Sequence, residues 1–208
     1  MRKDVVIINY GMGNVDSVKR AIEECGGSAV ISSDTEELNA ATHIILPGVG
    51  NFKTGMEHLM ADDIISRLEE QVIHEKKPFL GICLGMQLLA DKSWESGESR
   101  GLGWIHGDVK RFLPLDDSLR IPHIGWNEVH FTRESPLFAG IAPGKDFYFV
   151  HSYHFMGCRN EEILGTTPYG DHFPSVVNKE NIYGVQFHPE KSQKTGFKLI
   201  SNFLAIGE

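Results

Sequence analysis

Residues 78–87 read PFLGICLGMQ, and the organisation of the chain follows from this stretch. Phe79, Leu80 and Ile82 form a short apolar run of the kind that is buried on both faces in a parallel sheet. Cys83 follows in the frame Gly-x-Cys-x-Gly, whose counterpart with serine is the nucleophile elbow, a sharp turn from a strand into a helix. We therefore predict a buried strand, a strained turn at Cys83 and a helix that begins directly after it.

The predicted turn suits a reactive thiol. Gly81 and Gly85 let the backbone pass closely without a Cβ clash. The N-terminus of the following helix favours the thiolate over the thiol. A small buried cysteine at a tight strand–helix junction would have the same sequence, so this stretch alone leaves both interpretations open.

Size and charge narrow the class of protein. A chain of 208 residues with 41% hydrophobic and 23% charged residues is typical of one globular α/β domain, which we expect to span residues 1–208. Its formal net charge of −8 gives no basis for binding nucleic acid or an anionic membrane surface. No apolar run is long enough to span a bilayer.

Cysteine usage indicates the compartment. Cys25, Cys83 and Cys158 are far apart and odd in number, which argues against a disulfide framework and for a reducing environment. The first residues show no signal-peptide pattern, so we expect a cytoplasmic protein. No Cys-x-x-Cys pair is present to hold a structural zinc ion, and we expect neither a metal nor a cofactor.

The first part of the chain alternates between apolar runs and helical patterns. Strands are predicted at residues 5–8, 29–31, 44–46 and 79–82, with a helical segment after each, including a long one over residues 56–75. This alternation predicts a mostly parallel sheet flanked by helices. Ligands bind such sheets at the carboxyl ends of the strands, where Cys83 is expected.

Two glycine-containing loops follow strands of this sheet. In the loop at residues 47–52, PGVGNF, glycines flank Val49 and leave its backbone N–H open to stabilise an oxyanion, although an ordinary turn fits as well. The loop at residues 9–14, NYGMGN, lacks the known phosphate-binding fingerprints. We interpret it mainly as a tight turn, with a site-lining or partner-contacting role as the alternative.

The second half of the chain changes to short strands and turns. A polar loop is expected over residues 91–103, and the strands that follow predict an antiparallel extension of the sheet. We expect these strands at residues 108–112, 127–131, 147–150 and 175–177. A last strand at residues 182–187 and an amphipathic helix over residues 197–204 complete the chain.

His188 is the best candidate for a general base among the ten histidines. It follows an apolar strand directly, and Pro189 keeps the chain extended there. Glu190 lies two residues on and therefore points the same way, so its carboxylate can orient the imidazole. His151 and His154 would point to opposite faces of a strand, which argues against a shared metal ion.

Residues 78–89 and 185–190 resemble the two signature segments of the class I glutamine amidotransferases. The resemblance implies Cys83 as nucleophile, His188 as general base and acid, and Glu190 as the orienting carboxylate. It implies attack on the side-chain amide of glutamine, a γ-glutamyl thioester and release of ammonia, on a flavodoxin-like α/β fold. The positions that it assigns to glutamine binding are Gly50, Gln87, Ser152 and Tyr153, and those assigned to the oxyanion are the backbone at Val49 and Leu84.

Further segments narrow the resemblance to the HisH-type glutaminase subunits of imidazole glycerol phosphate synthases. These segments are residues 10–14, 47–52, 122–127, 147–153 and 188–192. The implied partner is a HisF-type (β/α)8 cyclase, which receives the ammonia within a heterodimer in histidine biosynthesis. The residues implied to face it are Tyr10, Met12, Asn14, Trp126, Asn127 and Lys191.

Other functions remain open at this point. Asn9 and the Phe155-Met156 pair depart from the usual pattern of the subfamily. They leave room for a paralogue that supplies ammonia to another synthase, such as one that amidates a surface sugar. The further alternatives are a stand-alone cysteine hydrolase and a non-catalytic regulatory subunit. We also expect glutaminase activity to depend on the partner, because glycines on both sides of Val49 make a peptide flip easy.

Overall fold

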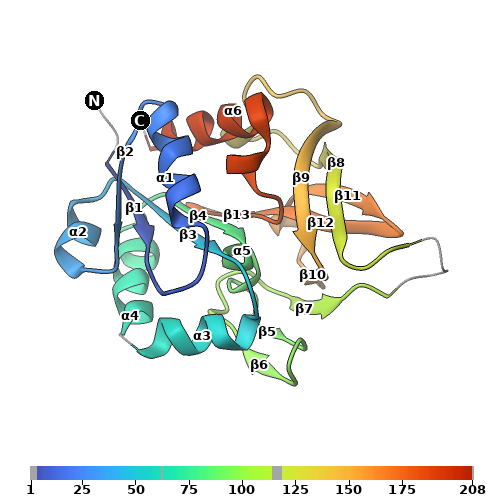
Figure 1. Cartoon of the computed structure of the whole chain (residues 1–208), viewed down its shortest axis with the longest axis horizontal. Coiled ribbons are helices and arrows are strands. Elements are labelled where there is room, and N and C mark those ends of the chain that lie inside the picture. The colour runs from blue at the N-terminus through green and yellow to red at the C-terminus, as the bar shows by residue number, and fades with distance from the viewer. Residues whose placement is uncertain (1–3, 62, 114–118, 208) are drawn as a thin grey trace.

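A nine-stranded sheet forms the centre of the computed structural model, which describes residues 4–61, 63–113 and 119–207 (Figure 1). Its parallel part consists, in spatial order, of β2 (Ser28–Ser32), β1 (Asp4–Ile8), β3 (His43–Gly48), β4 (Phe79–Cys83) and β13 (Ile182–Val185). Its antiparallel part continues with β12 (Asp171–Lys179), β11 (Ile163–Tyr169), β8 (His123–Phe131) and β9 (Lys145–His151). The predicted class, a mostly parallel α/β sheet with an antiparallel extension, is confirmed.

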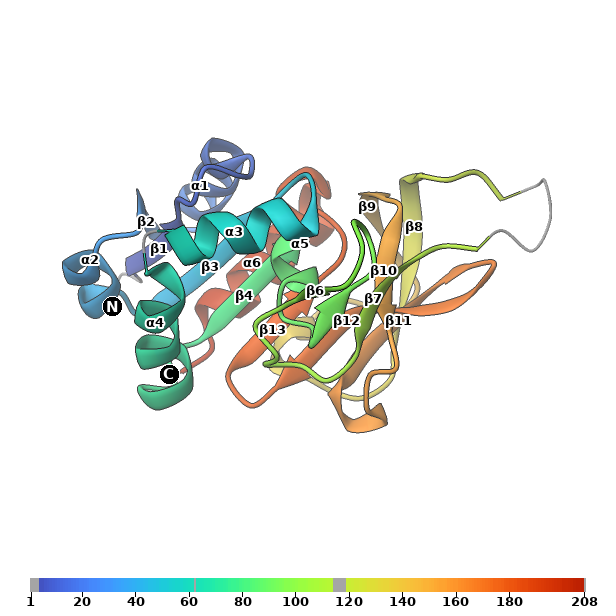
Figure 2. The ribbon, with the colours of Figure 1, turned by 90° about the horizontal axis from the view of Figure 1, so that it is seen from below.

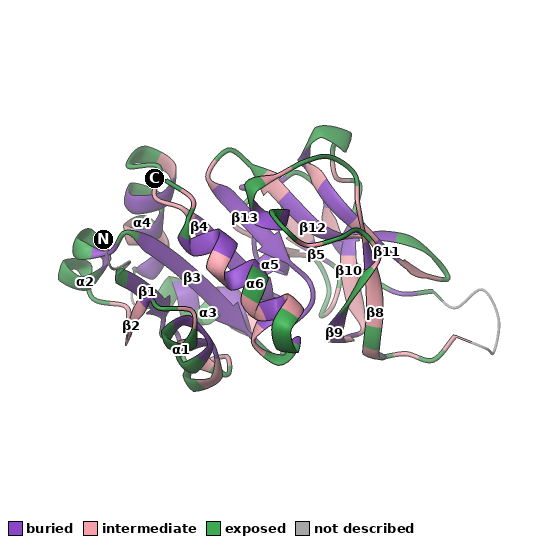
Figure 3. Ribbon diagram, turned by 90° about the horizontal axis from the view of Figure 1, so that it is seen from above, coloured by how far each residue is buried: buried purple, intermediate pink, exposed green. Residues whose placement is uncertain are grey.

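Alternate residues of the inner strands enter two different hydrophobic cores. Val5 and Ile7 of β1 pack with α1 (Val15–Glu24) and α6 (Gln193–Leu204) on one face. Val6 and Ile8 pack with α2 (Thr35–Ala40), α3 (Phe52–Ala61) and α4 (Ile64–Leu68) on the other. Seen from below, α3 and α4 lie in front of the sheet (Figure 2), and seen from above, α1 and α6 do (Figure 3). None of the helices in the described ranges is long and apolar enough to cross a membrane.

A second, smaller sheet packs beside the first. It contains β10 (Tyr153–Met156), β7 (Asp108–Arg111), β5 (Lys92–Ser93) and β6 (Ser99–Arg100) in that order. The expected polar loop over residues 91–103 therefore includes two short strands, which were not predicted, and neither were β10 and β11. Among the described residues of the second half, 3-10 turns lie at Pro136–Phe138, Asn160–Glu162 and Pro189–Lys191.

Two helical predictions need correction. The single helix expected over residues 56–75 is divided, because Asp63 takes a left-handed φ of 53° before α4, and a π-helix, η1 (Glu69–His74), follows α4. The spacing of Leu84, Leu88 and Leu89 predicts a helix after Cys83 that includes all three, but α5 (Leu84–Gln87) ends after four residues, before Leu88. The carbonyl groups that follow it at positions 88–90 instead accept hydrogen bonds from backbone N–H groups of residues 102–105, so the chain leaves the helix there.

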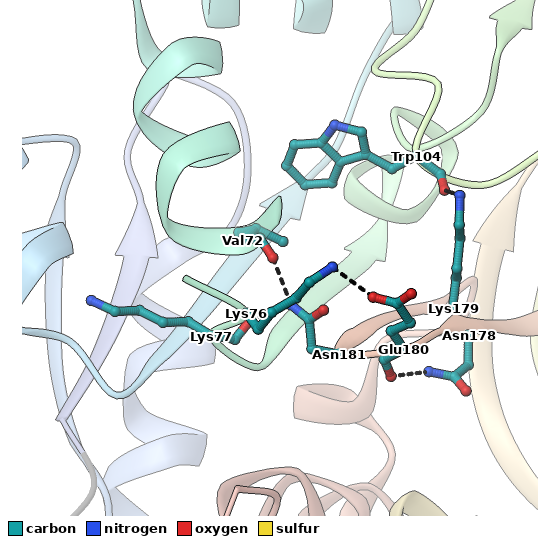
Figure 4. Close-up of polar contacts among 8 residues, drawn as sticks. All are labelled: Val72, Lys76, Lys77, Trp104, Asn178, Lys179, Glu180 and Asn181. Atoms are coloured by element: carbon teal, nitrogen blue, oxygen red, sulfur yellow. Dashed lines mark hydrogen bonds and ion pairs between the residues drawn. The ribbon is translucent and has the colours of Figure 1, made fainter. Parts of the chain in front are cut away.

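The turn before β13 fixes the alignment of the two strands that carry the predicted site. Asn181 donates from Nδ2 to the backbone oxygens of Val72 and Lys77, both at 2.8 Å (Figure 4). The backbone N–H of Phe79 donates to the carbonyl of Asn181 at 3.0 Å. These bonds set the parallel register in which Gly81 of β4 lies opposite Gly184 of β13, so both strands end at the same edge of the sheet.

Candidate active site

Cys83 occupies a strained turn at the carboxyl end of β4. Its φ of 55° and ψ of −109° lie in a region that L residues rarely adopt, as the sequence predicted. The flanking glycines are required by contact: a Cβ on Gly81 would lie 2.6 Å from the carbonyl oxygen of Gly85. A Cβ on Gly85 would overlap the carbonyl oxygen of Leu46. The turn that presents the thiol therefore requires glycine at both positions, because a larger residue at either one would clash.

His188 and Glu190 form a buried pair at the end of β13. Nδ1 of His188 lies 2.7 Å from Oε1 of Glu190, and the two side chains are 3% and 1% exposed. The carboxylate can only accept, so Nδ1 carries the proton and Nε2 is left to accept one. Within the described residues Nε2 of His188 has no hydrogen-bond partner. Burial alone lowers the pKa of His188, but its interactions with Cys83 and Glu190 outweigh burial and raise it from 6.5 to about 10.

A cavity of about 300 Å³ opens over Cys83 and His188. Its walls come from the loop after β3, from α5 and from the β9–β10 junction. The structure thus brings together all the positions expected to bind glutamine or the oxyanion, which are Val49, Gly50, Leu84, Gln87, Ser152 and Tyr153. A volume of this size suits a small polar molecule rather than a peptide.

Glu95 is a cavity residue that the sequence analysis missed. Its Oε2 accepts a hydrogen bond of 2.6 Å from the backbone N–H of Phe52, the first residue of α3. A carboxylate at a helix N-terminus is stabilised by the unpaired N–H groups there. Among the described residues that line the cavity, Glu95 is the acidic one. Nothing in the polar segment around Glu95 distinguishes it from its sequence neighbours, because its hydrogen-bond partner, Phe52, belongs to a different element.

A buried amide pair, also missed, connects the thiol to the cavity wall. Gln186 is fully buried, and its Nε2 lies 3.8 Å from Sγ of Cys83. Oε1 of Gln186 accepts from Nε2 of Gln87 at 3.0 Å. Nε2 of Gln87 also donates to the carbonyl of Tyr153 at 2.9 Å. The signal was available, because a glutamine between Val185 and Phe187 at the end of a buried strand needs polar partners inside the protein.

The two glycines that flank Val49 in the loop after β3 have different surroundings. Gly50 has a φ of +106°, and Val49 is 43% exposed. A Cβ on Gly48, by contrast, would overlap the hydroxyl of Tyr10 and lie 2.9 Å from the Cβ of Leu84. Glycine is therefore required at position 48 by the close packing and at position 50 by the positive φ.

The residues expected to face a partner divide into two groups. Trp126 is 48% exposed, and Lys191 is exposed with its Nζ 5.9 Å from the ring centroid of Tyr148. Trp126 contacts the same ring, with centroids 6.1 Å apart. We call Trp126, Tyr148 and Lys191 the rim group. Lys191 directly follows Glu190 in the chain, which connects this group to the buried His188–Glu190 pair. On the β1–α1 loop, Met12 is half-buried and Asn14 is exposed.

Tyr10 is buried, which corrects the expectation that its side chain faces a partner, and the half-buried side chain of Asn127 forms its hydrogen bonds inside the protein. Tyr10 is only 5% exposed, and its hydroxyl donates to the carbonyl of Pro47 at 2.9 Å. Burial raises the pKa of this phenol well above its ordinary value. The amide of Asn127 donates to the carbonyl of Pro168 at 2.8 Å and contacts Nε2 of His123 at 3.2 Å. Both side chains therefore have structural contacts inside the protein.

Comparisons with known proteins identify a family and relatives of this chain. The family model "Glutamine amidotransferase class-I" matches residues 6–206. Imidazole glycerol phosphate synthase subunit HisH 2 of Methanococcus maripaludis is 48% identical over 96% of this chain and 98% of its own length. The HisH 1 subunit of Campylobacter jejuni strain RM1221 is 43% identical over 97% of this chain and 100% of its own.

Solved structures show the same fold. The PurLQS structure from Thermotoga maritima aligns with a TM-score of 0.74 at 18% identity and covers 99% of both chains. The structure of a glutamine amidotransferase from the same organism aligns with a TM-score of 0.64 at 20% identity, covering 94% of this chain and 79% of its own.

Proposed function

This chain belongs to the class I glutamine amidotransferases, and we propose that it is the glutaminase subunit of an imidazole glycerol phosphate synthase. Relatives that carry this subunit name are 41–48% identical over nearly the whole chain. The observation that carries the proposal is the meeting of Cys83 with the buried His188–Glu190 pair beneath a cavity of about 300 Å³. The reaction is hydrolysis of glutamine to glutamate and ammonia.

Each group of the triad has a role in the proposed reaction. The raised pKa of His188 favours transfer of the Cys83 proton to its Nε2, and the resulting thiolate attacks the side-chain carbonyl carbon of glutamine. The backbone N–H groups at Val49 and Leu84 stabilise the oxyanion of the tetrahedral intermediate. The imidazolium returns its proton to the nitrogen, so the C–N bond breaks, ammonia leaves and a γ-glutamyl thioester remains. Glu190 holds the Nδ1–H and stabilises the imidazolium throughout.

Hydrolysis of the thioester uses the same groups in reverse. Nε2 of His188 takes a proton from water, and the hydroxide oxygen attacks the thioester carbon. Collapse of the second tetrahedral intermediate breaks the C–S bond and returns the proton to the sulfur of Cys83. Glutamate leaves with one oxygen from water, and the enzyme is restored.

The cavity wall suits the other end of glutamine. Glu95 presents a carboxylate that can pair with the α-ammonium group of the substrate. The amide of Gln87, the backbone of Ser152 and Tyr153, and the loop at Gly50 supply hydrogen-bonding groups around it. A charged pocket of this kind distinguishes free glutamine from a glutamine within a peptide, whose α-nitrogen carries no charge.

The ammonia is delivered, in our proposal, to a HisF-type (β/α)8 cyclase bound as a heterodimer on the rim group. Trp126 and Lys191 offer an exposed aromatic and an exposed cationic contact on either side of the half-buried Tyr148, and aromatic residues are common at interface hot spots. The cyclase uses the ammonia to form imidazole glycerol phosphate and an aminoimidazole carboxamide ribotide. Ammonia protonates in water and loses its nucleophilicity, so a sealed passage between the subunits is required. We place this complex, which needs no metal or cofactor for the glutaminase step, in the cytoplasm.

Glutamate release from glutamine tests the proposal. It should be measured for the purified chain alone and with a cyclase partner and its nucleotide substrate. We expect strong stimulation by the loaded partner that Cys83→Ala abolishes and Cys158→Ala, a control at a thiol outside the cavity, preserves. Full activity without any partner would instead indicate a stand-alone hydrolase. No stimulation, with a cyclase that is active on added ammonium, would indicate a paralogue that serves another synthase.

A further inference from the structure

Two buried histidines that the proposed mechanism does not use lie beside the cavity. His123 begins β8 and His151 ends β9, and the two residues are direct partners in the antiparallel register. Their side chains meet, with Nδ1 of His123 at 2.9 Å from Nε2 of His151. The residues are 3% and 7% exposed, and His151 lines the cavity.

The hydrogen bonds determine the tautomer of each ring. Nδ1 of His151 lies 2.8 Å from the carbonyl oxygen of Tyr153, which can only accept, so His151 carries its proton on Nδ1. Nε2 of a neutral His151 must then accept from Nδ1–H of His123. Nε2 of His123 in turn accepts from the amide of Asn127 at 3.2 Å. All the bonds therefore run in one direction, from Asn127 to the carbonyl of Tyr153.

The amide end of this chain is fixed independently. Oδ1 of Asn127 accepts from the backbone N–H of Glu128 at 2.9 Å, and Nδ2 also donates to the carbonyl of Pro168 at 2.8 Å. Both contacts require the orientation in which Nδ2 faces His123. The direction of the chain therefore follows from backbone groups at both ends rather than from a choice of ring protons.

The surroundings keep both rings neutral. His123 stacks between Tyr169 and Phe149, with ring centroids 3.9 and 4.8 Å away. Burial lowers the pKa of His123 to about 4. Burial lowers the pKa of His151 to about 3, and the charge of the nearby His188 acts in the same direction. A neutral ring has one donor and one acceptor, as this arrangement requires.

We propose that Asn127, His123 and His151 form a one-way relay of hydrogen bonds that positions the Tyr153 carbonyl in the wall of the glutamine cavity and connects it to strand β8. The relay ends on the carbonyl that also accepts from Gln87, so two donors fix one peptide group of the wall. It begins beside Trp126, which is exposed on β8. The relay thus deepens the proposed function: its residues position the substrate site without touching the reacting atoms.

The tautomers give a direct test that needs no activity. Long-range ¹H–¹⁵N correlation spectra of the full chain with ¹⁵N-labelled histidine, assigned with the single-site variants, report which nitrogen carries the proton. We expect the Nδ1–H form for both His123 and His151 at neutral pH. An Nε2–H form of either ring in the wild-type chain would overturn the proposal.

An isosteric substitution tests the direction of the relay. Asn127→Asp replaces the donor to His123 by an acceptor of the same shape, so His123 should change to its Nε2–H form and cease to donate to His151. Asn39→Asp makes the same change of charge on α2 and should leave both rings unchanged. Wild-type ring signals in Asn127→Asp would refute the relay.

Kinetics in the complex with the cyclase test the positioning role. His123→Phe keeps the stacking but leaves Nε2 of His151 without its donor, and we expect KM for glutamine to rise about tenfold with kcat within about twofold. His154→Phe is the matched control, because His154 stacks on Phe112 in the same cluster but its Nδ1 contacts the adjacent Phe155 carbonyl and not the relay. An unchanged KM in a folded His123→Phe complex would contradict the positioning role. A wild-type complex that releases no glutamate would refute the proposed function, whereas the spectra would still decide the relay.

Discussion

Replacing Glu190 by glutamine should separate the assembly of the site from its chemistry. The variant keeps the shape of the side chain and removes a negative charge that is 1% exposed and 2.7 Å from Nδ1 of His188. With the amide oxygen toward His188, the NH₂ group occupies the position of Oε2, which is buried and has no partner among the described residues. With the NH₂ group toward His188, the ring is forced to its Nε2–H form and cannot accept from the thiol. Both orientations remove the carboxylate that stabilises the imidazolium.

The size of the effect follows from the lost interaction. A buried hydrogen bond to a charged group contributes about 1.5–3 kcal/mol, which corresponds to a loss of about 10- to 150-fold in kcat. The substitution removes the contribution of Glu190 and leaves that of Cys83, so the pKa of His188 should fall from its raised value of about 10. KM for glutamine should stay nearly unchanged, because Glu190 does not line the cavity.

The assay is glutamate release by the complex under saturating glutamine, with Glu180→Gln as the control. Glu180 carries the same charge, but its side chain is 65% exposed and pairs with Lys76 at the opposite edge of the sheet (Figure 4). We expect the control to behave as the wild type, since such exposed pairs contribute little. A folded Glu190→Gln complex with kcat within twofold of the wild type would show that this carboxylate does not support the imidazolium.

Three further predictions follow from the same contacts. Gly85→Ala places a Cβ against the carbonyl oxygen of Leu46, so the free energy of unfolding measured in urea should fall by about 3 kcal/mol or more. The control Gly157→Ala, at a φ of +73° where a Cβ meets no atom within contact distance, should lose only about 1 kcal/mol. Equal losses would contradict the steric argument. Glu95→Gln should raise KM for glutamine about tenfold or more by removing the partner of the α-ammonium, and an unchanged KM would exclude that pairing. Burial lowers the pKa of His123 to about 4 and of His151 to about 3; the unfolded chain therefore binds more protons than the folded chain below about pH 6.5, and each ring should remove about 1.4 kcal/mol of stability per unit as the pH falls toward those values. His123→Phe should decline less steeply between about pH 6 and pH 5, and parallel curves would refute the assignment.

Local patterns were enough to predict the parallel core and the triad. The apolar run of β4 and the frame around Cys83 specify a buried strand and a tight turn, and both are present. His188 and Glu190 pair at 2.7 Å as predicted, but through the 3-10 turn Pro189–Lys191 and not through the extended segment that the proline was expected to impose. These features depend on neighbours within a few residues, which is the range over which backbone geometry is predictable from sequence.

Features that depend on distant elements were not predictable in the same way. Glu95 enters the cavity because it pairs with the first N–H of α3. The side chain of Asn127 turns inward because two acceptors lie there. They are the carbonyl of Pro168 on β11 and Nε2 of His123 at the start of β8. Tyr10 is buried because the carbonyl of Pro47 accepts its hydroxyl. In each case a polar atom forms a hydrogen bond with a residue of another segment, and the spacing of residues in the sequence does not predict that partner.

The order of the triad along the chain is a consequence of topology. β13 returns from the antiparallel part of the sheet to pair with β4 in parallel, so the carboxyl ends of the two strands lie side by side. A nucleophile placed after β4 and a base placed after β13 therefore meet although about a hundred residues separate them. The excursion between them builds β9 and β10, whose junction forms the opposite cavity wall. The antiparallel extension is thus part of the site, because without it the thiol and its base would open directly to water.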